Sequence, residues 1–223
     1  MTINELAEIS VTNGLILSDD QLAKLSKYAE LLRAKNQVVN LISRKDEENI
    51  LSKHILHSLT LIFPELPMAE IPQGAKVFDL GTGGGLPGIP IKIARSDISL
   101  TLCDSIAKKI AATNEIANDL NLKNTQAITD RAENLAMKKQ HKQMYDVVIT
   151  RAVAKLDELI QWSHGLLKKN GVLLALKGGD IQDEIIRTKG FRFVRSVEEA
   201  PLSLKGYDEF LKEEKKIVRV MFV

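Results

Sequence analysis

The chain has 223 residues but only one cysteine, Cys103. No internal disulfide can form, and the cysteine-rich zinc patterns are excluded. No segment reaches the roughly 18–20 consecutive apolar residues that a membrane span requires. The first residues, M-T-I-N-E-L-A-E, include acidic residues but no basic segment, which is unlike a signal peptide. These absences predict a cytoplasmic protein without a membrane partner, and we expect no metal site.

Net charge is also small, at +2, and it is unevenly divided. Residues 1–75 carry 7 Lys and Arg against 10 Asp and Glu, whereas residues 76–223 carry 24 against 19. Neither part demands a nucleic-acid partner and neither excludes one, because a basic patch is a local feature that totals conceal.

The residue pattern changes near residue 73. Before it, apolar residues recur at helical spacing over 19–36, capped by Ser18 or Asp19, and over 47–62, capped by Asp46. Residues 63–74 contain three prolines and a glycine, which predicts a connector. After it, short strands alternate with helices. The predicted strands are 76–80, 98–103, 125–129, 145–150, 171–176, 191–197 and 216–223, and the predicted helices are one beginning around Pro87 and Pro90 and those of 105–120, 155–168 and 179–188.

This alternation predicts an α/β fold with a mostly parallel, seven-stranded sheet that is covered on both faces. We expect a helical segment over residues 1–73 and a Rossmann-like domain over residues 74–223. Ligands of such sheets bind at the carboxyl ends of the strands.

The first of these strand ends carries D-L-G-T-G-G-G-L-P-G-I-P (79–90), with five glycines in eight positions. A P-loop is excluded because no Lys-Ser/Thr pair follows the glycines. Gly83, Gly85 and Gly88 match a dinucleotide fingerprint, but Gly81, Gly83 and Gly85 also complete D-x-G-x-G-x-G from Asp79. A carboxylate at that position would repel a pyrophosphate and attract the ammonium group of an amino acid. The loop therefore favours S-adenosyl-L-methionine, which is cationic and has no phosphate.

Acidic residues also follow the next two strands. Asp104 ends the second strand, where a carboxylate accepts hydrogen bonds from both ribose hydroxyls. NAD enzymes use the same device, so Asp104 indicates a ribose and not one particular cofactor. The cluster D-R-A-E (130–133) follows the third strand, where an adenine would reach.

The fourth strand ends in V-I-T-R-A-V (148–153) and lacks the N/D-P-P-Y and Pro-Cys sequences of amine and pyrimidine-carbon methylation. Its conspicuous polar residue, Arg151, cannot act as a general base. It can hydrogen-bond a guanine edge, hold a phosphate or fix the cofactor. Guanine N7 carries no proton, so its methylation needs mainly proximity and orientation. The segment is compatible with this acceptor and leaves others open.

Seven short motifs in order resemble the small-subunit ribosomal RNA methyltransferase G family (RsmG or GidB). They are N-L-I-S-R-K (40–45), K-H-I-L-H-S (53–58), the glycine segment 79–90, L-C-D-S (102–105), R-A-E (131–133), T-R-A (150–152) and L-K-G (176–178). The resemblance implies a class I S-adenosylmethionine-dependent methyltransferase fold. It also implies methylation of guanine N7 at position 527 of 16S rRNA, in the decoding-region loop.

The resemblance also implies site residues. We expect Arg151 to take part in catalysis and in cofactor binding. The other expected cofactor residues are Asp79, Gly81, Gly83, Gly85, Leu86, Asp104, Ala132 and Glu133. From the residues themselves, we expect Arg44, Lys53, His54 and Lys177 to bind RNA, with Lys45 and His57 on the same basic surface. For His54, which lies on or beside the apolar stripe, a buried and hydrogen-bonded histidine is an equal alternative. The partner would be 16S rRNA within the small ribosomal subunit or an assembly intermediate, bound by a monomer.

The N-terminal part departs from the family pattern. His57 stands where the family has aspartate, Lys53 stands where it has arginine, and the tryptophan before N-L is missing. Two other functions stay open: methylation of another acceptor, such as a small molecule, and non-enzymatic rRNA binding. An NAD-type oxidoreductase is disfavoured by Asp79 and by the lack of a proton donor.

Overall fold

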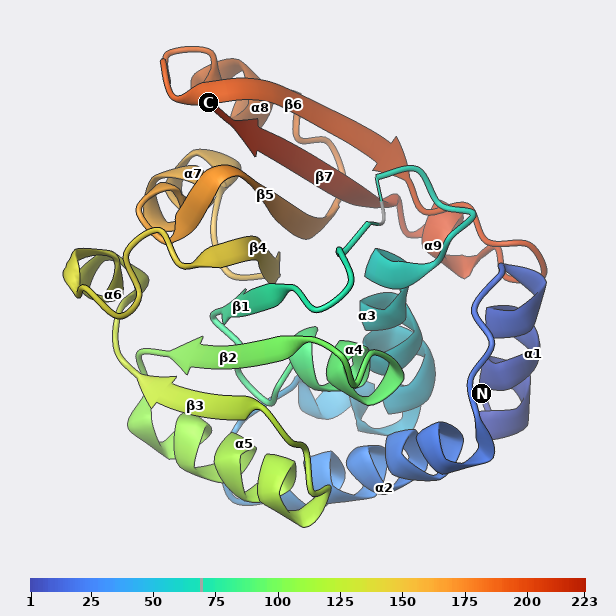
Figure 1. The fold of residues 1–223 in the computed structure, drawn as a ribbon. Coiled ribbons are helices and arrows are strands. Elements are labelled where there is room, and N and C mark those ends of the chain that lie inside the picture. Colours follow the sequence, from blue (N-terminus) through green and yellow to red (C-terminus); the bar gives the residue numbers. More distant parts are fainter. Residues whose placement is uncertain (69) are drawn as a thin grey trace.

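The computed structural model describes residues 1–68 and 70–223. Its centre is a seven-stranded sheet with the order β3-β2-β1-β4-β5-β7-β6, so β3 and β6 form its edges (Figure 1). The strands are β1 (Lys76–Leu80), β2 (Ser99–Asp104), β3 (Thr125–Thr129), β4 (Tyr145–Arg151), β5 (Leu167–Gly178), β6 (Val194–Pro201) and β7 (Lys215–Phe222). Strands β1 to β5 are parallel to one another, and β7 is antiparallel to β5 and β6. The predicted α/β fold with a mostly parallel sheet is confirmed.

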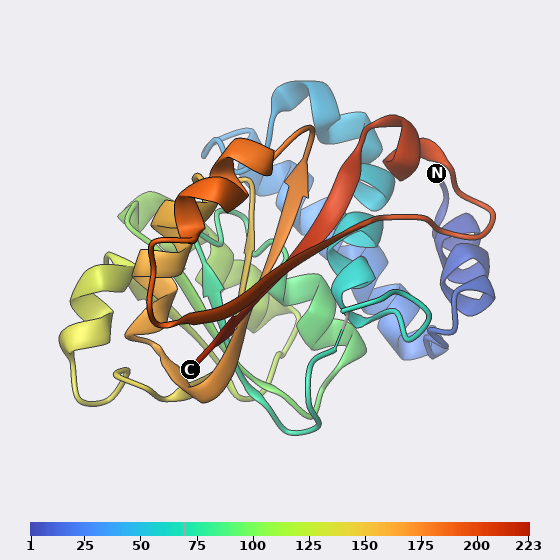
Figure 2. The same ribbon diagram turned by 90° about the horizontal axis from the view of Figure 1, so that it is seen from above.

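Helices cover both faces of this sheet (Figure 2). One face carries α4 (Gly88–Ala94) and α5 (Ala107–Asp119), together with the N-terminal α1 (Ile3–Thr12), α2 (Asp19–Asn36) and α3 (His57–Leu59). The other face carries α6 (Ala132–Met137), α7 (Leu156–His164) and α8 (Gln182–Thr188). The short α9 (Glu209–Lys212) precedes β7.

A separate hydrophobic core lies on each face. Leu25 and Ile55 of the N-terminal part belong to the same buried cluster as Val77 of β1 and Ile116 of α5. The second cluster joins Val148 and Leu173 of the sheet to Leu159 of α7. The N-terminal helices therefore share a core with the sheet, and the boundary near residue 73 stays a prediction.

Residues 47–62 do not form the single α-helix, capped by Asp46, that their periodicity predicts. Ser43 caps a 3-10 segment, η1 (Arg44–Asn49), and the chain continues as a π-helix, η2 (Ile50–Leu56), then as α3 and the 3-10 turn η3 (Thr60–Ile62). The apolar stripe is still buried, at Ile50, Ile55, Leu59 and Ile62. The winding was missed because tertiary contacts set it, and π-helical turns are frequent at functional sites.

Other elements differ from the prediction mainly at their ends. The helix predicted over 155–168 ends at His164, and β5 already begins at Leu167 and bends at Asn170, whose φ is 62°. The strand predicted over 191–197 begins at Val194, because Phe191 and Phe193 stack together and Phe193 also stacks on His164. The helices α1, α6 and α9 were not predicted. Within the described residues, no helix is both long and apolar enough to cross a membrane.

Candidate functional site

The glycine loop follows β1 and is shaped by close packing. Gly81 has a φ of +70°, and a Cβ there would lie 2.5 Å from Val153 Cγ2. Gly85 has a φ of +95°, and its Cβ would collide with the side chain of Ile89. Tyr28 of α2 donates a hydrogen bond of 2.9 Å from its hydroxyl to the carbonyl of Gly84. Side chains at Gly81 and Gly85 are therefore excluded by both space and backbone conformation.

Asp79 lies fully buried beneath this loop. Its Oδ2 accepts hydrogen bonds from Thr82 Oγ1 at 2.6 Å and from Gly88 N at 2.9 Å, while Oδ1 has no partner within the described residues. Burial raises the pKa of Asp79 to about 7, although both hydrogen bonds oppose the shift. Asp79 therefore braces the turn and retains one free acceptor, and its contact with an ammonium group stays a prediction.

A pocket of about 360 Å³, here called the first pocket, opens at the carboxyl ends of β1, β2 and β3. Asp104 lies on its wall, where Oδ2 accepts from Gly83 N at 3.1 Å and Oδ1 accepts from Ile106 N at 2.9 Å. These bonds orient the carboxylate and leave lone pairs on both oxygens for further donors. The residues that line the first pocket are Leu80, Gly81, Cys103, Asp104, Ser105, Lys109, Asp130, Arg131, Ala132, Glu133, Ala152, Val153 and Trp162.

Four of the nine expected cofactor residues thus meet in the first pocket: Gly81, Asp104, Ala132 and Glu133. The other four members of the glycine segment, Asp79, Gly83, Gly85 and Leu86, are not on its lining. Leu86 is 4% exposed and belongs to the core. Sequence reasoning missed Trp162 and Val153. Trp162 is the single tryptophan of the chain, and the helical pattern gave no sign that α7 would bring it there.

A second pocket of about 490 Å³ lies beside the first, and both are lined by Ala152. Ala152 follows β4 and has a φ of 54°, a left-handed conformation that is uncommon for alanine and concentrates at functional sites. The lining comes from η1, η2 and α3, from the ends of β4 and β5, from α8, from the residue after α9 and from the start of β7. It consists of Asp46, Lys53, His54, His57, Arg151, Ala152, Leu176, Lys177, Gly178, Glu184, Glu213 and Lys215.

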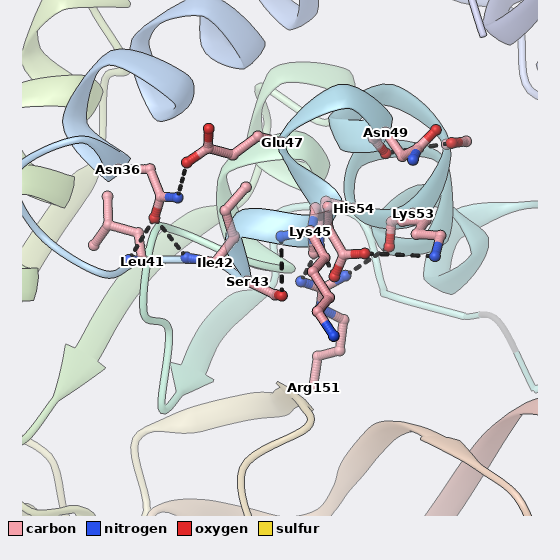
Figure 3. Close-up of polar contacts among 12 residues, drawn as sticks. Asn36, Leu41, Ile42, Ser43, Lys45, Glu47, Asn49, Lys53, His54 and Arg151 are labelled. Carbon is pink, nitrogen blue, oxygen red and sulfur yellow. Dashed lines mark hydrogen bonds and ion pairs between the residues drawn. The ribbon is translucent and has the colours of Figure 1, made fainter.

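Arg151 is held in the second pocket by two neutral groups (Figure 3). Its Nη1 donates to the Lys53 carbonyl at 2.9 Å, and its Nη2 lies 2.6 Å from His54 Nδ1. A guanidinium only donates hydrogen bonds, so Nδ1 of His54 accepts and the ring proton is on Nε2. Burial and the charge of Arg151 lower the pKa of His54 to about 3, which keeps this ring neutral.

The segment before η2 is fixed by a buried asparagine. Asn36 Oδ1 accepts hydrogen bonds from the backbone N–H groups of Leu41 and Ile42, at 2.8 and 2.9 Å (Figure 3). Its Nδ2 donates to Glu47 at 2.6 Å. Asn36 thereby ties the end of α2 to the segment that supplies Asp46, Lys53 and His54 to the second pocket.

The two histidines do not belong to the expected basic surface, and the alternative of a buried, hydrogen-bonded His54 is confirmed. His57 is 5% exposed, its Nε2 has no partner within the described residues, and its ring lies 5.1 Å from that of Phe210. Burial lowers the pKa of His57 well below its ordinary value, with Arg151 adding to the shift. His57 is therefore a neutral core residue, because its helix turns it inward against α9. His54 is 7% exposed and is likewise buried.

The remaining basic residues differ in exposure and pairing. Arg44 and Lys45 are exposed on η1. Lys53 is exposed and lies 3.4 Å from Asp46 and 3.9 Å from Glu213. Lys177 is only 13% exposed in its side chain and pairs with Glu184 at 2.8 Å. Its contact with RNA stays a prediction, as do those of the other three expected residues.

Two further observations concern metal ions and the cysteine. Among the described residues, no group of three or more His, Cys, Asp or Glu is arranged to hold a metal ion. Cys103 is buried, and burial raises the pKa of its thiol to about 12. A thiolate nucleophile at this position is therefore disfavoured.

Comparisons with known proteins give a consistent result. Residues 21–209 match the family model of rRNA small subunit methyltransferase G, GidB. The ribosomal RNA small subunit methyltransferase G of Chlorobaculum tepidum is 39% identical over 211 residues, which cover 92% of each chain. The protein of the same name from Chlorobium phaeobacteroides is 38% identical over 220 residues, covering 96% of this chain and 94% of that protein.

Solved structures with the same fold are more distant in sequence. A predicted O-methyltransferase from Agrobacterium tumefaciens superimposes with a TM-score of 0.56 at 13% identity, over 74% of this chain and 80% of that one. A precorrin-6y C5,15-methyltransferase from Geobacter metallireducens gives 0.53 at 14% identity, over 78% and 90%. The class I methyltransferase fold is confirmed.

Proposed function

Because the chain belongs to the rRNA small subunit methyltransferase G family, we propose that it methylates N7 of one guanine in 16S rRNA, position 527, with S-adenosyl-L-methionine as methyl donor. The observation that carries this proposal is the arrangement of the two pockets, which meet at Ala152 beside Arg151. A cofactor in one pocket and an acceptor in the other would face each other at this boundary.

The first pocket suits this cofactor. Its volume of about 360 Å³ lies within the ordinary range for small ligands, about 300–1,000 Å³. Asp104 presents oriented acceptors for two ribose hydroxyls, and Ala132 and Glu133 would border the adenine. The close approach of Gly81 to Val153 leaves no space for a side chain. The free Oδ1 of Asp79 suits a donor such as an ammonium group or a bridging water.

The reaction requires no proton transfer to or from the protein. The cofactor supplies a methyl group on a positively charged sulfur. The N7 lone pair forms a bond to the methyl carbon as the carbon–sulfur bond breaks, so the positive charge moves from sulfur to the purine and no proton is lost. Proximity and alignment therefore account for most of the catalysis. This fits a site whose central group is an arginine and whose two histidines stay neutral.

The second pocket would receive the guanine. Arg151 can donate to O6 of the base, and carboxylates such as Asp46 and Glu213 can accept from its N1–H and N2–H groups. The same carboxylates would offset the positive charge that methylation leaves on the purine. The exposed Arg44, Lys45 and Lys53 suit contacts to the surrounding phosphates.

The natural substrate would be rRNA in the small subunit or in an assembly intermediate, and the proposed activity would take place in the cytoplasm on a monomeric enzyme. The test is to incubate the protein with methyl-labelled cofactor and small subunits, naked 16S rRNA or buffer, and then to map the label. We expect label on N7 of a single guanine. Label on an exocyclic amine would contradict N7 transfer, and no label on any RNA would favour a small-molecule acceptor or a binding role.

A further inference from the structure

The unusual feature of Arg151 is that neither of its hydrogen-bonding partners is a carboxylate. Arg151 is half-buried, and an arginine drawn away from water is ordinarily paired with a carboxylate. Here its two hydrogen-bonding partners are a backbone carbonyl, of Lys53, and a neutral imidazole, of His54. The ion pairs found among the described residues include Lys53 but not Arg151. The guanidinium is therefore fixed in position while its charge remains uncompensated by any direct contact.

We infer that His54 is a positioning residue that aims Arg151 at the boundary of the two pockets and leaves its positive charge free for an anionic group, a carboxylate or a phosphate. This inference rests on the proposed function, methyl transfer to rRNA. A carboxylate in place of His54 would hold Arg151 as firmly, but it would neutralise the charge that the ligand needs. The imidazole supplies an acceptor without a charge.

The surroundings of His54 are consistent with this role. Nε2, which carries the ring proton, has no hydrogen-bond partner within the described residues. It lies 3.9 Å from Asp46 Oδ2, whose negative charge favours a proton on that nitrogen and leaves Nδ1 free to accept. Lys53 and Lys215 also lie near the ring, and like Arg151 they oppose its protonation. The neighbouring His57 is neutral too, so neither imidazole competes with Arg151 as a cation.

The carbonyl partner comes from the same segment. Lys53 and His54 are consecutive residues of η2, and both contact the guanidinium of Arg151. Arg151 is the last residue of β4, and Thr150 before it donates to the Leu80 carbonyl at 2.9 Å, which fixes the strand end. The backbone of Arg151 is thus held by the sheet, and its guanidinium is held by η2.

Two substitutions separate the functions of the two ring nitrogens. In His54→Asn the side-chain oxygen lies near the position of Nδ1 and can accept from Arg151. In His54→Gln the amide reaches toward the position of Nε2 and leaves no acceptor at Nδ1. His141→Asn is the matched control, because His141 is also buried and also uses Nδ1, toward the Tyr145 hydroxyl at 2.7 Å, but does not line either pocket.

The experiment measures kcat and KM with small ribosomal subunits, and the dissociation constants of adenosylhomocysteine and methylthioadenosine, for all variants. We expect His54→Gln to lose roughly tenfold to a hundredfold in kcat/KM, as for a hydrogen bond to a charged group, and His54→Asn and His141→Asn to stay within about threefold of wild type. If the anion is the cofactor carboxylate, His54→Gln weakens adenosylhomocysteine but not methylthioadenosine, which lacks that carboxylate. If it is an RNA phosphate, both dissociation constants stay unchanged and KM for the subunit rises.

Equal losses in His54→Asn and His54→Gln would overturn the inference, since they would show that size alone matters. So would a His54→Gln enzyme as active as wild type. A wild-type protein that methylates no guanine would instead overturn the proposed function. Melting temperatures of the three variants, which we expect to be similar, keep a folding defect from being mistaken for a loss of positioning.

Discussion

The first pocket lies mainly at the carboxyl ends of three adjacent strands, whereas the second pocket joins residues from near both ends of the chain. Gly81, Asp104 and Ala132 each lie within a few residues of the end of β1, β2 or β3. The second pocket needs His54 from η2, Arg151 from β4 and Glu213 after α9. The two also differ in electrostatics, because the carboxylate of Asp104 is held by backbone donors and the cation Arg151 is held by neutral acceptors.

This difference indicates that the first pocket binds the cofactor and the second pocket selects the acceptor, as in the proposed function. A pocket at adjacent strand ends is fixed as soon as the sheet forms and suits a constant cofactor. A pocket that closes only when both chain ends pack on the sheet can be shaped for one acceptor. The predictions below separate the two pockets, beginning with the largest expected effect.

Replacing Arg151 should abolish most activity by damaging the second pocket. Arg151→Lys keeps a cation but cannot donate in the same two directions to the Lys53 carbonyl and His54. We expect kcat/KM to fall by about a hundredfold to a thousandfold, the cost of disrupting a half-buried, hydrogen-bonded charge. The measurement is methyl transfer to small subunits.

Arg95→Lys is the control for that substitution. Arg95 makes a two-point contact with Asp97 at 2.8 Å but lies outside both pockets. It should lower the melting temperature at most and leave kcat/KM near the wild-type value. A loss of activity in Arg95→Lys equal to that in Arg151→Lys would show that the arginine acts through stability.

Asp104→Asn should damage the first pocket alone. The amide presents only one acceptor and no negative charge to the ribose, so we expect cofactor affinity to fall about tenfold, as when a charge-assisted hydrogen bond is lost. Calorimetry with adenosylhomocysteine measures this, and KM for the subunit should not change. Asp97→Asn is the control, because Asp97 also accepts from a backbone N–H, that of Gly74 at 2.8 Å, but lies outside the pockets.

The contributions of His54, in the second pocket, and of Asp79, beneath the glycine loop, to stability should change with pH in opposite directions. The pKa of His54 is about 3 in the fold against 6.5 unfolded, so its contribution to stability is present above 6.5 and is lost as pH falls toward 3. The pKa of Asp79 is about 7 against 3.8, so its contribution is largest at acid pH and is lost as pH rises from 3.8 to 7.

Denaturant unfolding of two variants between pH 4 and pH 8 tests this opposition. His54→Asn should reduce the loss of stability between pH 6.5 and pH 5, where His54 alone contributes about 2 kcal/mol. Asp79→Asn should remove the decline between pH 5 and pH 7. Parallel pH curves for wild type and both variants would show that neither group titrates as its burial implies.

The smallest effects are expected at the rim. Arg44→Ala and Lys45→Ala should each raise KM for the subunit a few-fold and lower the slope of log affinity against log salt by about one, as for the loss of one phosphate contact. Lys123→Ala is the control, because Lys123 is exposed just before β3, at the opposite end of the strands. An unchanged salt slope in Arg44→Ala and Lys45→Ala would place the RNA elsewhere.

The sequence predicts the strand ends of the first pocket better than it predicts the second pocket. Strand periodicity and the glycine segment predict β1 and β3 to the residue, and they place Gly81, Asp104 and Glu133 at one edge of the sheet. Local pattern cannot predict that α7 carries Trp162 into the first pocket, or that η2 winds as a π-helix. It also predicts His57 as a surface cation, because helical periodicity does not show that α9 covers that face.

A crystal structure of the full chain with adenosylhomocysteine tests the division between the pockets most directly. The account predicts the ligand in the first pocket, with its ribose hydroxyls on Asp104, its adenine beside Ala132 and Glu133, and its sulfur turned toward Ala152. Ligand bound in the second pocket, or a ribose that does not contact Asp104, would contradict it.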